Sequence, residues 1–388
     1  REYNFEQRFQ ALLPRTRRSV MKEIEQGFPH VPKGCSIILE RQAQEIILAH
    51  IRASINNLRN IRRKVVDYFT HHREWRIGEF FEDYHVKPLE VYGRQTPTTV
   101  YGLGVRENVV ACGEPFDEAR EKVLARGLER LSFCNSARFI RFALAALERI
   151  REGRGQALDG LDAAERRLLL MLYYTFWNVG LSDLEGRPFG SVEEALYWLI
   201  GHPLAYAELC DLLRYQYERI DIVGRPIEGL DADIPLDLYC NYTTDQILAA
   251  LGRHQAWKHR HFQEGVLYVE ERNMDVFFVT LVKSERDYSP TTMYQDYAIS
   301  ERVFHWQSQS RTTVGSPTGR RYVNQGKTGH PVLFFVREKK RNESGVTMPY
   351  TCVGLADYRS HRGSAPISME WTMREPLPAF VLDVAGRG

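Results

Sequence analysis

Apolar residues recur at three- and four-residue spacing through the first two thirds of the chain, a pattern typical of amphipathic helices. One such helix is predicted between Gln42 and Tyr68, and others over about 117–131, 136–151, 162–178 and 191–215. Asp162 and Ser191 are suited to cap helices, because Glu follows each three residues later, and Thr243 or Thr244 should cap a short helix that ends at Gly252. Pro97 predicts a loop over residues 93–104. We therefore expect residues 41–252 to form an all-helical domain.

The pattern changes after Gly252, where short runs rich in β-branched and aromatic residues alternate with Gly, Pro, Ser and Asn. Six strands are predicted, at 266–270, 276–283, 303–309, 331–337, 350–354 and 367–373. The run 276–282 is almost continuously apolar, which indicates a central strand buried on both faces. The fold class expected from both halves is therefore α+β, with residues 253–388 forming a small β-barrel or sandwich.

Composition adds few constraints, since 43% hydrophobic and 26% charged residues are ordinary for a globular protein. No apolar stretch is long enough to span a bilayer, and no signal peptide is visible, so we expect a bacterial cytoplasmic protein without a membrane partner. The sequence starts at Arg1, inside a helical pattern, and we expect it to be a piece of a longer chain.

Charge is distributed unevenly along the chain. Residues 253–388 hold 19 Lys and Arg against 14 Asp and Glu, whereas the rest of the chain is slightly acidic. Basic residues gather in turns of the predicted β-domain, and they are Arg311, Arg320, Arg321, Lys327, Lys339, Lys340, Arg341, Arg359 and Arg362. Turns of this kind easily contact phosphates, so an anionic partner is expected to meet the C-terminal part. A solvated surface explains any one of them equally well.

Known catalytic motifs are absent from the sequence. It has no phosphate-binding loop of the Walker type, no Cys-x-x-Cys pair and no zincin or serine-hydrolase motif, so neither a catalytic residue nor a cofactor is assigned. The histidines between His254 and His261 are the nearest approach to a metal or acid–base site. No carboxylate stands in fixed register beside them in the sequence, and a solvated basic linker without metal is the simpler interpretation.

Aromatic and polar side chains are concentrated between Tyr288 and Gln309. Tyr294 and Tyr297 flank Asp296, and Trp306, Gln307 and Gln309 follow. An extruded base needs aromatic walls against its faces and a carboxylate or amide at its Watson–Crick edge, and Asp296 could accept the N4 amino group of cytosine. We therefore predict a base-binding pocket with Tyr294, Tyr297 and Trp306 as walls and Asp296, Gln307 and Gln309 as edge readers. A role of these aromatic residues in the domain core is the alternative.

Several segments together resemble a known family. Residues 287–311, with Ser-Pro-Thr-Thr-Met-Tyr and Phe-His-Trp-Gln-Ser-Gln, are similar to a C-terminal region shared by bacterial superfamily 2 helicases. So are the segments 316–322, 333–338, 349–358 and 376–378. Residues 3–9 and 28–35 resemble the segment just past the second RecA-like domain. The likeness points to SauUSI-like ATP-dependent type IV restriction enzymes, and it is weakest over residues 93–250.

This resemblance implies three domains: the tail of a helicase RecA-like domain at 1–40, a helical coupler at 41–252, and an SRA-like (PUA-like) β-barrel that recognises DNA at 253–388. The last domain would bind 5-methyl- or 5-hydroxymethylcytosine in double-stranded DNA by base flipping. Arg311, Arg320, Arg321 and Lys327 would contact phosphates. The coupler would relay binding to the ATPase and nuclease domains of the parent chain, which would use ATP and Mg²⁺ in defence against phage and foreign DNA.

Two other classes of function remain open from the sequence. The chain could be a protein-interaction and regulatory module of a helicase that does not itself bind DNA. It could also be a hydrolase that uses the histidines between His254 and His261. The enzymatic status of the chain is uncertain, and we expect it to be the non-catalytic part of an ATP-dependent restriction endonuclease.

Overall fold

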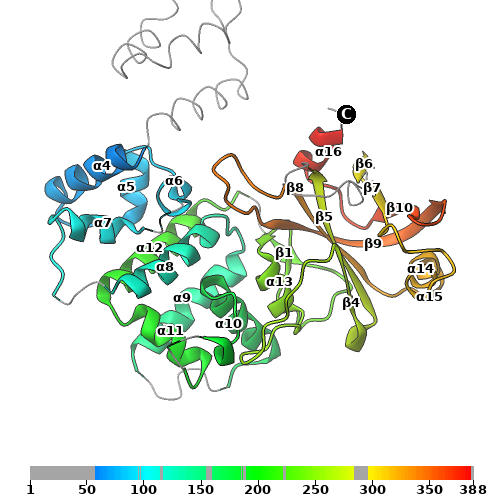
Figure 1. The fold of residues 1–388 in the computed structure, drawn as a ribbon, viewed down its shortest axis with the longest axis horizontal. Coiled ribbons are helices and arrows are strands. Elements are labelled where there is room, and N and C mark those ends of the chain that lie inside the picture. The colour runs from blue at the N-terminus through cyan, green and yellow to red at the C-terminus, as the bar shows by residue number, and fades with distance from the viewer. Residues whose placement is uncertain are drawn as a thin grey trace, which may run out of the picture.

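The computed structural model has an α+β fold, with helices in the N-terminal part and a sheet in the C-terminal part (Figure 1). It describes residues 57–94, 96, 98–113, 117–153, 160–184, 186, 189–221, 224–283 and 296–385. The expected RecA-like tail at 1–40 lies outside these residues. The helices of the first part are α4 (Leu58–His71), α5 (Ile77–Asp83), α6 (Pro88–Tyr92), α7 (Val100–Arg106), α8 (Glu118–Leu131), α9 (Ala137–Arg151), α10 (Ala163–Phe176), α11 (Val192–Ile200) and α12 (Pro203–Glu218). None of the described helices is both long and apolar enough to cross a membrane.

The predicted caps begin helices as expected. Asp162 and Glu165 form a reciprocal capping box at α10, and Thr243 does the same with Gln246 at α13 (Thr244–Ala250). Ser191 accepts a hydrogen bond from the Glu194 amide at α11. The predicted loop over 93–104 was wrong in its second half, because Thr99 caps α7 and the helix starts at Val100.

Among the described residues of the C-terminal part, eight strands form one sheet. They are β3 (Asn241–Tyr242), β4 (Val266–Val269), β5 (Met274–Val282), β6 (Tyr297–Ser300), β7 (Val303–Gln307), β8 (Val332–Lys339), β9 (Tyr350–Arg362) and β10 (Ser368–Met373). Their order is β4-β5-β8-β9-β10-β7-β6, with β3 paired to β9. The β5–β8 pair is parallel and the other pairs are antiparallel. The path is open among the described strands, so the expected closed barrel is not found there.

Strand β5 confirms the prediction of a central strand. It lies between β4 and β8, and its side chains alternate between two cores. Val276 and Phe278 face the core shared with the helices, whereas Phe277 and Val279 face a second core covered by α14 (Pro317–Val323) and α16 (Ala379–Ala385). A strand buried on both faces needs apolar residues at every position, which explains the continuous run.

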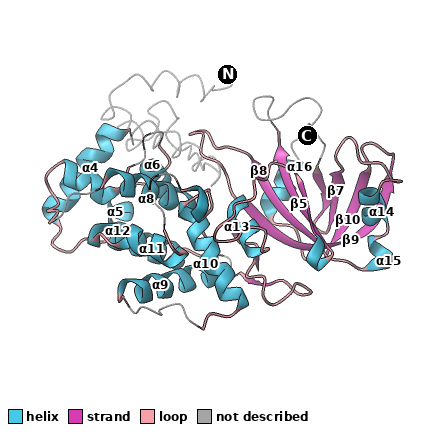
Figure 2. Ribbon diagram, turned by 60° about the horizontal axis from the view of Figure 1, so that its bottom comes forward, coloured by secondary structure: helices cyan, strands magenta, loops and turns pink. Residues whose placement is uncertain are grey.

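The two parts of the molecule share the segment around α13. Figure 2 shows α13 between the helical layer and the sheet. Its main contacts are with α10, while β3, just before it in the chain, pairs with β9. An ion-pair network adds a second link, since Asp233 binds both Arg167 of α10 at 2.9 Å and Arg272 at 2.6 Å. The sheet is therefore fastened to the helices at more than one point.

Candidate functional site

A cavity of about 620 Å³ opens beside the ends of β5, β7 and β8, and we call it the β-cavity. Its aromatic lining consists of Phe262, Phe278, Trp306 and Tyr350. Its polar lining includes Gln263, Glu264, Thr280, Asp296, Gln307 and Gln309, and its cations are Lys283, Arg337 and Lys340. Volumes of roughly 300–1,000 Å³ are typical of small-molecule sites. The β-cavity thus brings together four of the predicted base-binding residues: Asp296, Trp306, Gln307 and Gln309.

Asp296 lies in the wall of the β-cavity, where its carboxylate is held from two sides. One oxygen accepts a hydrogen bond from the Lys283 ammonium at 2.6 Å, and the other accepts a hydrogen bond from the backbone N–H of Gln307 at 3.0 Å. Both charged side chains are almost buried, with exposed fractions of 8% for Lys283 and 5% for Asp296. A carboxylate offers about four lone-pair positions, so these bonds fix its orientation and leave acceptor capacity.

Arg337 is also fixed within the lining. Its Nε donates to the Thr280 hydroxyl at 2.9 Å, and its guanidinium lies 4.1 Å from the ring centroid of Tyr350. A cation over an aromatic face is attracted by the ring quadrupole. The sequence reasoning missed Arg337, Tyr350 and Phe262, because they come from strands and loops far from Asp296 in the chain. Only the parallel pairing of β5 with β8 brings Arg337 beside Thr280.

Trp306 belongs chiefly to the second core. Its ring stacks on Phe277 with centroids 4.1 Å apart and planes 9° apart, and Tyr322 meets it edge-on at 5.5 Å. Only 4% of the residue is exposed. The core alternative therefore applies to most of this side chain, and Trp306 gives the β-cavity part of its floor rather than a stacking face.

The predicted tyrosine walls do not enclose Asp296 in the described part of the chain. Tyr297 follows Asp296 directly, and neighbouring residues of a strand project to opposite faces. The residue is 37% exposed, and its ring stacks on that of His305 with centroids 4.6 Å apart. It is not among the residues that line the β-cavity. Tyr294 lies outside the described residues.

The four predicted phosphate contacts fall into two groups. Arg321 binds Asp275 through two hydrogen bonds of 2.7 and 2.8 Å, and its guanidinium lies over Tyr268. His330 Nε2 donates to the same carboxylate at 3.0 Å. Because Asp275 lies on β5, the bonds of Arg321 help to hold α14 on the sheet. Arg311, Arg320 and Lys327 are exposed, the last two on α14 and on α15 (Gln325–Thr328), which leaves their charges accessible to an anion.

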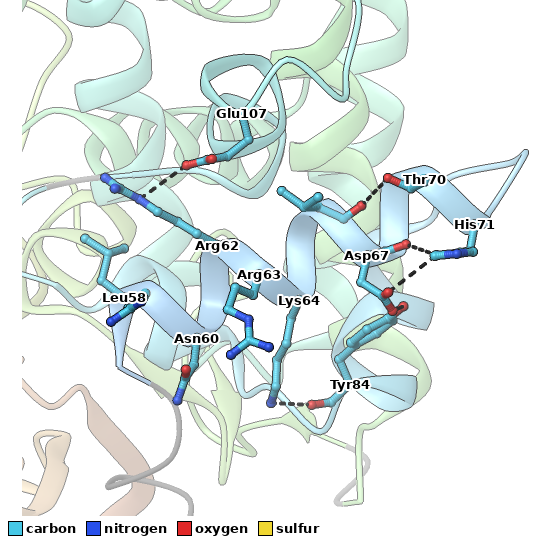
Figure 3. A pocket seen from close by; sticks show the side chains of 12 residues that line it. Leu58, Asn60, Arg62, Arg63, Lys64, Asp67, Thr70, His71, Tyr84 and Glu107 are labelled. Atoms are coloured by element: carbon cyan, nitrogen blue, oxygen red, sulfur yellow. Dashed lines mark hydrogen bonds and ion pairs between the residues drawn. The ribbon is translucent and has the colours of Figure 1, made fainter.

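A second hollow, of about 1060 Å³, runs along α4 in the helical part (Figure 3). Its lining includes Arg59, Arg62, Arg63 and Lys64. Lys64 donates to the Tyr84 carbonyl at 2.7 Å, and Arg62 lies 3.7 Å from Glu107. The hollow is lined mainly by α4, and beside these cations it has one tyrosine, Tyr84, and one side-chain amide, Asn60, fewer such groups than the β-cavity has.

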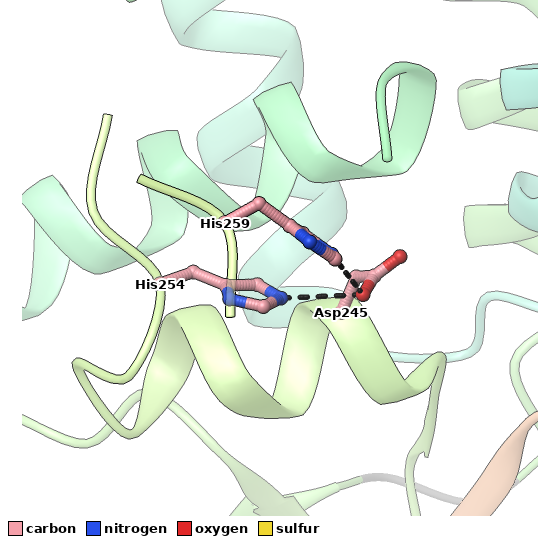
Figure 4. Close-up of side chains that lie close together, drawn as sticks. All are labelled: Asp245, His254 and His259. Carbon is pink, nitrogen blue, oxygen red and sulfur yellow. Dashed lines mark hydrogen bonds and ion pairs between the residues drawn. The ribbon is translucent and has the colours of Figure 1, made fainter. Parts of the chain in front are cut away.

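Asp245, His254 and His259 form the one cluster of three possible metal ligands found in the described residues (Figure 4). Both imidazole Nε2 atoms lie 3.2 Å from the same Asp245 oxygen. Burial alone would raise the pKa of Asp245, but the hydrogen bonds from the two histidines lower it overall. The interpretation of this segment as a solvated linker was wrong for His254, which is only 1% exposed, and a carboxylate from α13 meets the rings of His254 and His259.

The protonation of His254 decides what this cluster can bind. The Arg260 amide donates to Nδ1 of His254 at 3.2 Å, so Nδ1 carries no proton. The proton of the neutral ring is then on Nε2, where it is donated to Asp245. A metal ligand needs a free lone pair on that nitrogen, and its other nitrogen normally donates. The residues thus do not fit a metal site in this arrangement, and they fit a hydrogen-bonded clasp between α13 and the segment that follows it.

One family model matches the C-terminal part of the chain. Residues 236–383 match a domain of unknown function (DUF3427). The matched segment contains β3, α13, the whole sheet and every described residue that lines the β-cavity. No curated protein matches the chain. The β-cavity and the Asp245 clasp therefore lie within the matched segment.

Proposed function

We propose that the sheet region reads double-stranded DNA at a cytosine modified at C5, and that the helical part couples this binding to an ATP-driven helicase and nuclease motor. The β-cavity carries the proposal. It places a carboxylate, two amides and aromatic surface around one hollow, which is the set of groups that hold an extruded base. The resemblance of several segments, residues 287–311 among them, to a C-terminal region of bacterial superfamily 2 helicases and, through it, to SauUSI-like type IV restriction enzymes supports the same function.

Asp296 would accept the N4 amino group of the cytosine. The orientation of the Asp296 carboxylate is set by Lys283 and by the backbone N–H of Gln307, so the base would meet a carboxylate that needs no reorganisation. Each specific contact of this kind contributes about 1–3 kcal/mol of discrimination between bases. The exposed cations Arg311, Arg320 and Lys327 would bind phosphates and give affinity without sequence information.

Fluorescence anisotropy with the 388-residue chain tests the proposal. Three duplexes of one sequence would carry cytosine, 5-methylcytosine or 5-hydroxymethylcytosine at a single position, and binding would be measured at several salt concentrations. We expect at least one modified duplex to bind about ten-fold more tightly than the unmodified one, with affinity falling as salt rises. Gln309→Ala should reduce this preference, whereas Gln255→Ala, an exposed glutamine outside the β-cavity, should not.

Two results would contradict the proposal. Equal binding of all three duplexes would remove the modified base as the ligand. Absence of any salt-dependent binding would favour a protein-interaction module that restrains a motor without touching DNA.

A further inference from the structure

Trp257 lies at the tip of a tight turn outside the β-cavity. Gln255 and Lys258 exchange backbone hydrogen bonds of 3.1 and 3.3 Å across this turn, and we call residues 255–258 the Trp257 turn. The residue is 54% exposed, the largest fraction recorded for a large apolar side chain among the described residues. Tryptophan is enriched where proteins meet their ligands, because it combines a large flat surface with an N–H donor.

The helical part holds the backbone of the Trp257 turn from one side. The Leu181 amide donates to the Ala256 carbonyl at 2.9 Å, and the Ser182 hydroxyl donates to the Trp257 carbonyl. A Cβ atom at Gly180 would lie 2.6 Å from the Trp257 carbonyl oxygen, so the close approach of the two segments requires glycine there. The backbone of the turn is therefore fixed although its aromatic side chain points into solvent.

The Asp245 clasp fixes the same turn at both of its ends (Figure 4). His254 and His259, which flank the turn, both bind the Asp245 carboxylate. The Tyr174 hydroxyl also donates to the Gln255 carbonyl at 2.7 Å. A rigid backbone lowers the conformational entropy that an aromatic anchor loses on binding, and such anchors contribute a large share of the affinity at interfaces. The turn thus presents its indole ring in an arrangement prepared for a ligand.

The segment that contains the turn is basic. From Arg253 to Gln263 it holds three Lys and Arg residues and no Asp or Glu. Arg253 is paired with Glu271, whereas Lys258 is exposed and follows Trp257 directly. An aromatic face next to a cation is the combination that binds unpaired nucleic acid, because the base stacks on the ring and the cation meets the phosphate. A purely apolar protein partner would make no use of this charge.

We propose that the Trp257 turn binds an unpaired nucleotide of a nucleic-acid strand, with the indole ring stacked on the base and Lys258 on the adjoining phosphate. This site goes beyond the proposed function, because stacking tolerates any base and needs no modified cytosine. Its position favours the same ligand. Four residues separate Trp257 from Phe262 in the lining of the β-cavity, so the two sites are at most about 18 Å apart along the chain. A strand that is unpaired at the β-cavity would pass close to the turn.

Fluorescence anisotropy with the 388-residue chain and two single strands tests the proposal. One strand is an oligothymidine of about eight nucleotides, and the other is an abasic strand of the same length, so that neither contains cytosine. We expect the oligothymidine to bind about ten-fold more tightly, which is the effect of one stacked base. Trp257→Ala should remove this difference and change binding of the abasic strand less than about two-fold, while Trp257→Phe should keep most of the difference. Lys258→Ala should weaken both strands and make the slope of log affinity against log salt shallower by about 0.7.

Tyr197→Ala is the matched control, because Tyr197 is 53% exposed on α11, and it should bind both strands as the wild type does. Equal binding of the two strands by the wild type would overturn the proposal. So would an oligothymidine preference that Trp257→Ala retains or that Tyr197→Ala also removes. The duplexes with cytosine and 5-methylcytosine report on the proposed function separately, since Trp257→Ala should leave the ratio of their affinities unchanged. Loss of single-strand binding with that ratio intact would reject the Trp257 site alone.

Discussion

The helical part and the sheet part both bury carboxylates, but they use them differently. In the helical part, Glu208 accepts hydrogen bonds from the Tyr92 hydroxyl and from the amides of Val100 and Tyr101, at 2.6 to 2.9 Å. This carboxylate is fully buried and serves the start of α7. In the sheet part, Asp296 is equally well held, yet it faces the β-cavity. Substitutions at Glu208 should therefore affect stability, and those around Asp296 should affect binding.

A second carboxylate strengthens this contrast. Glu121 accepts from the Thr99 amide and hydroxyl and binds Arg106 through two further bonds of 2.6 and 2.9 Å. A Cβ atom at residue 102 would collide with the Glu121 carboxylate, so glycine is required there. In the helical part, the buried carboxylates Glu121 and Glu208 thus bind the start of α7, and neither of them lines the β-cavity or the hollow along α4.

The largest predicted effect concerns Glu208. Burial raises the pKa of this carboxyl to about 7 from its usual 4.5, against the three hydrogen bonds that lower it. Between these pH values the folded state keeps a proton that the unfolded chain releases. The stabilisation is complete below pH 4.5 and is lost as pH rises through 7. A shift of this size corresponds to about 3 kcal/mol.

Urea denaturation of the wild type and of Glu208→Gln between pH 4.5 and 7.5 measures this pH-dependent change in the free energy of unfolding. The wild type should lose stability across this range, while the variant should start lower and vary less. Glu79→Gln, an exposed carboxyl on α5, controls for surface charge. If the two variants show the same pH dependence, Glu208 does not titrate in this range. The contrast between a stabilising Glu208 and a ligand-binding Asp296 would then lose its support.

An intermediate effect is predicted at the Asp245 clasp, which joins α13 to the segment that follows it. Asp245→Asn should lower the free energy of unfolding by about 2 kcal/mol, because two imidazole N–H groups lose a charged acceptor. The metal content of the purified chain should be well below one ion per molecule, and a chelator should leave the thermal midpoint unchanged. Finding one zinc ion per chain would instead mean that His254 has released its Nε2 proton and that the Asp245 clasp is a metal site. Gln255→Ala serves as the control in the same segment.

Much of the fold could be predicted because its determinants are local. The caps at Asp162 and Thr243 and the apolar run of β5 each depend on a few neighbouring residues. The open strand path depends instead on which distant strands pair. The parallel neighbours β5 and β8 are separated in sequence by β6, β7, α14 and α15. No local pattern encodes that choice, so a closed barrel was expected.

The candidate site was only partly predictable for the same reason. Asp296, Gln307 and Gln309 could be found because they are close in sequence and line one cavity. Trp306 has the aromatic side chain that base stacking needs, but it stacks on Phe277 of another strand and lies in the second core. Asp245 was missed as the partner of His254, since the turn after α13 brings them together. A signal was present in the capped helix α13 and in Gly252, whose positive φ turns the chain just after the helix and directly before the histidines.

The smallest predicted effect compares the exposed basic surfaces of the two parts. Lys327→Ala on α15 should leave stability unchanged within about 0.5 kcal/mol and weaken binding of modified and unmodified duplexes alike. The slope of log affinity against log salt should become shallower by about one, as expected for one lost phosphate contact. Arg63→Ala on α4, an equally exposed cation in the helical part, should leave this slope unchanged. The opposite result, a slope altered by Arg63→Ala and not by Lys327→Ala, would indicate that DNA binds at the hollow along α4 and not at the sheet.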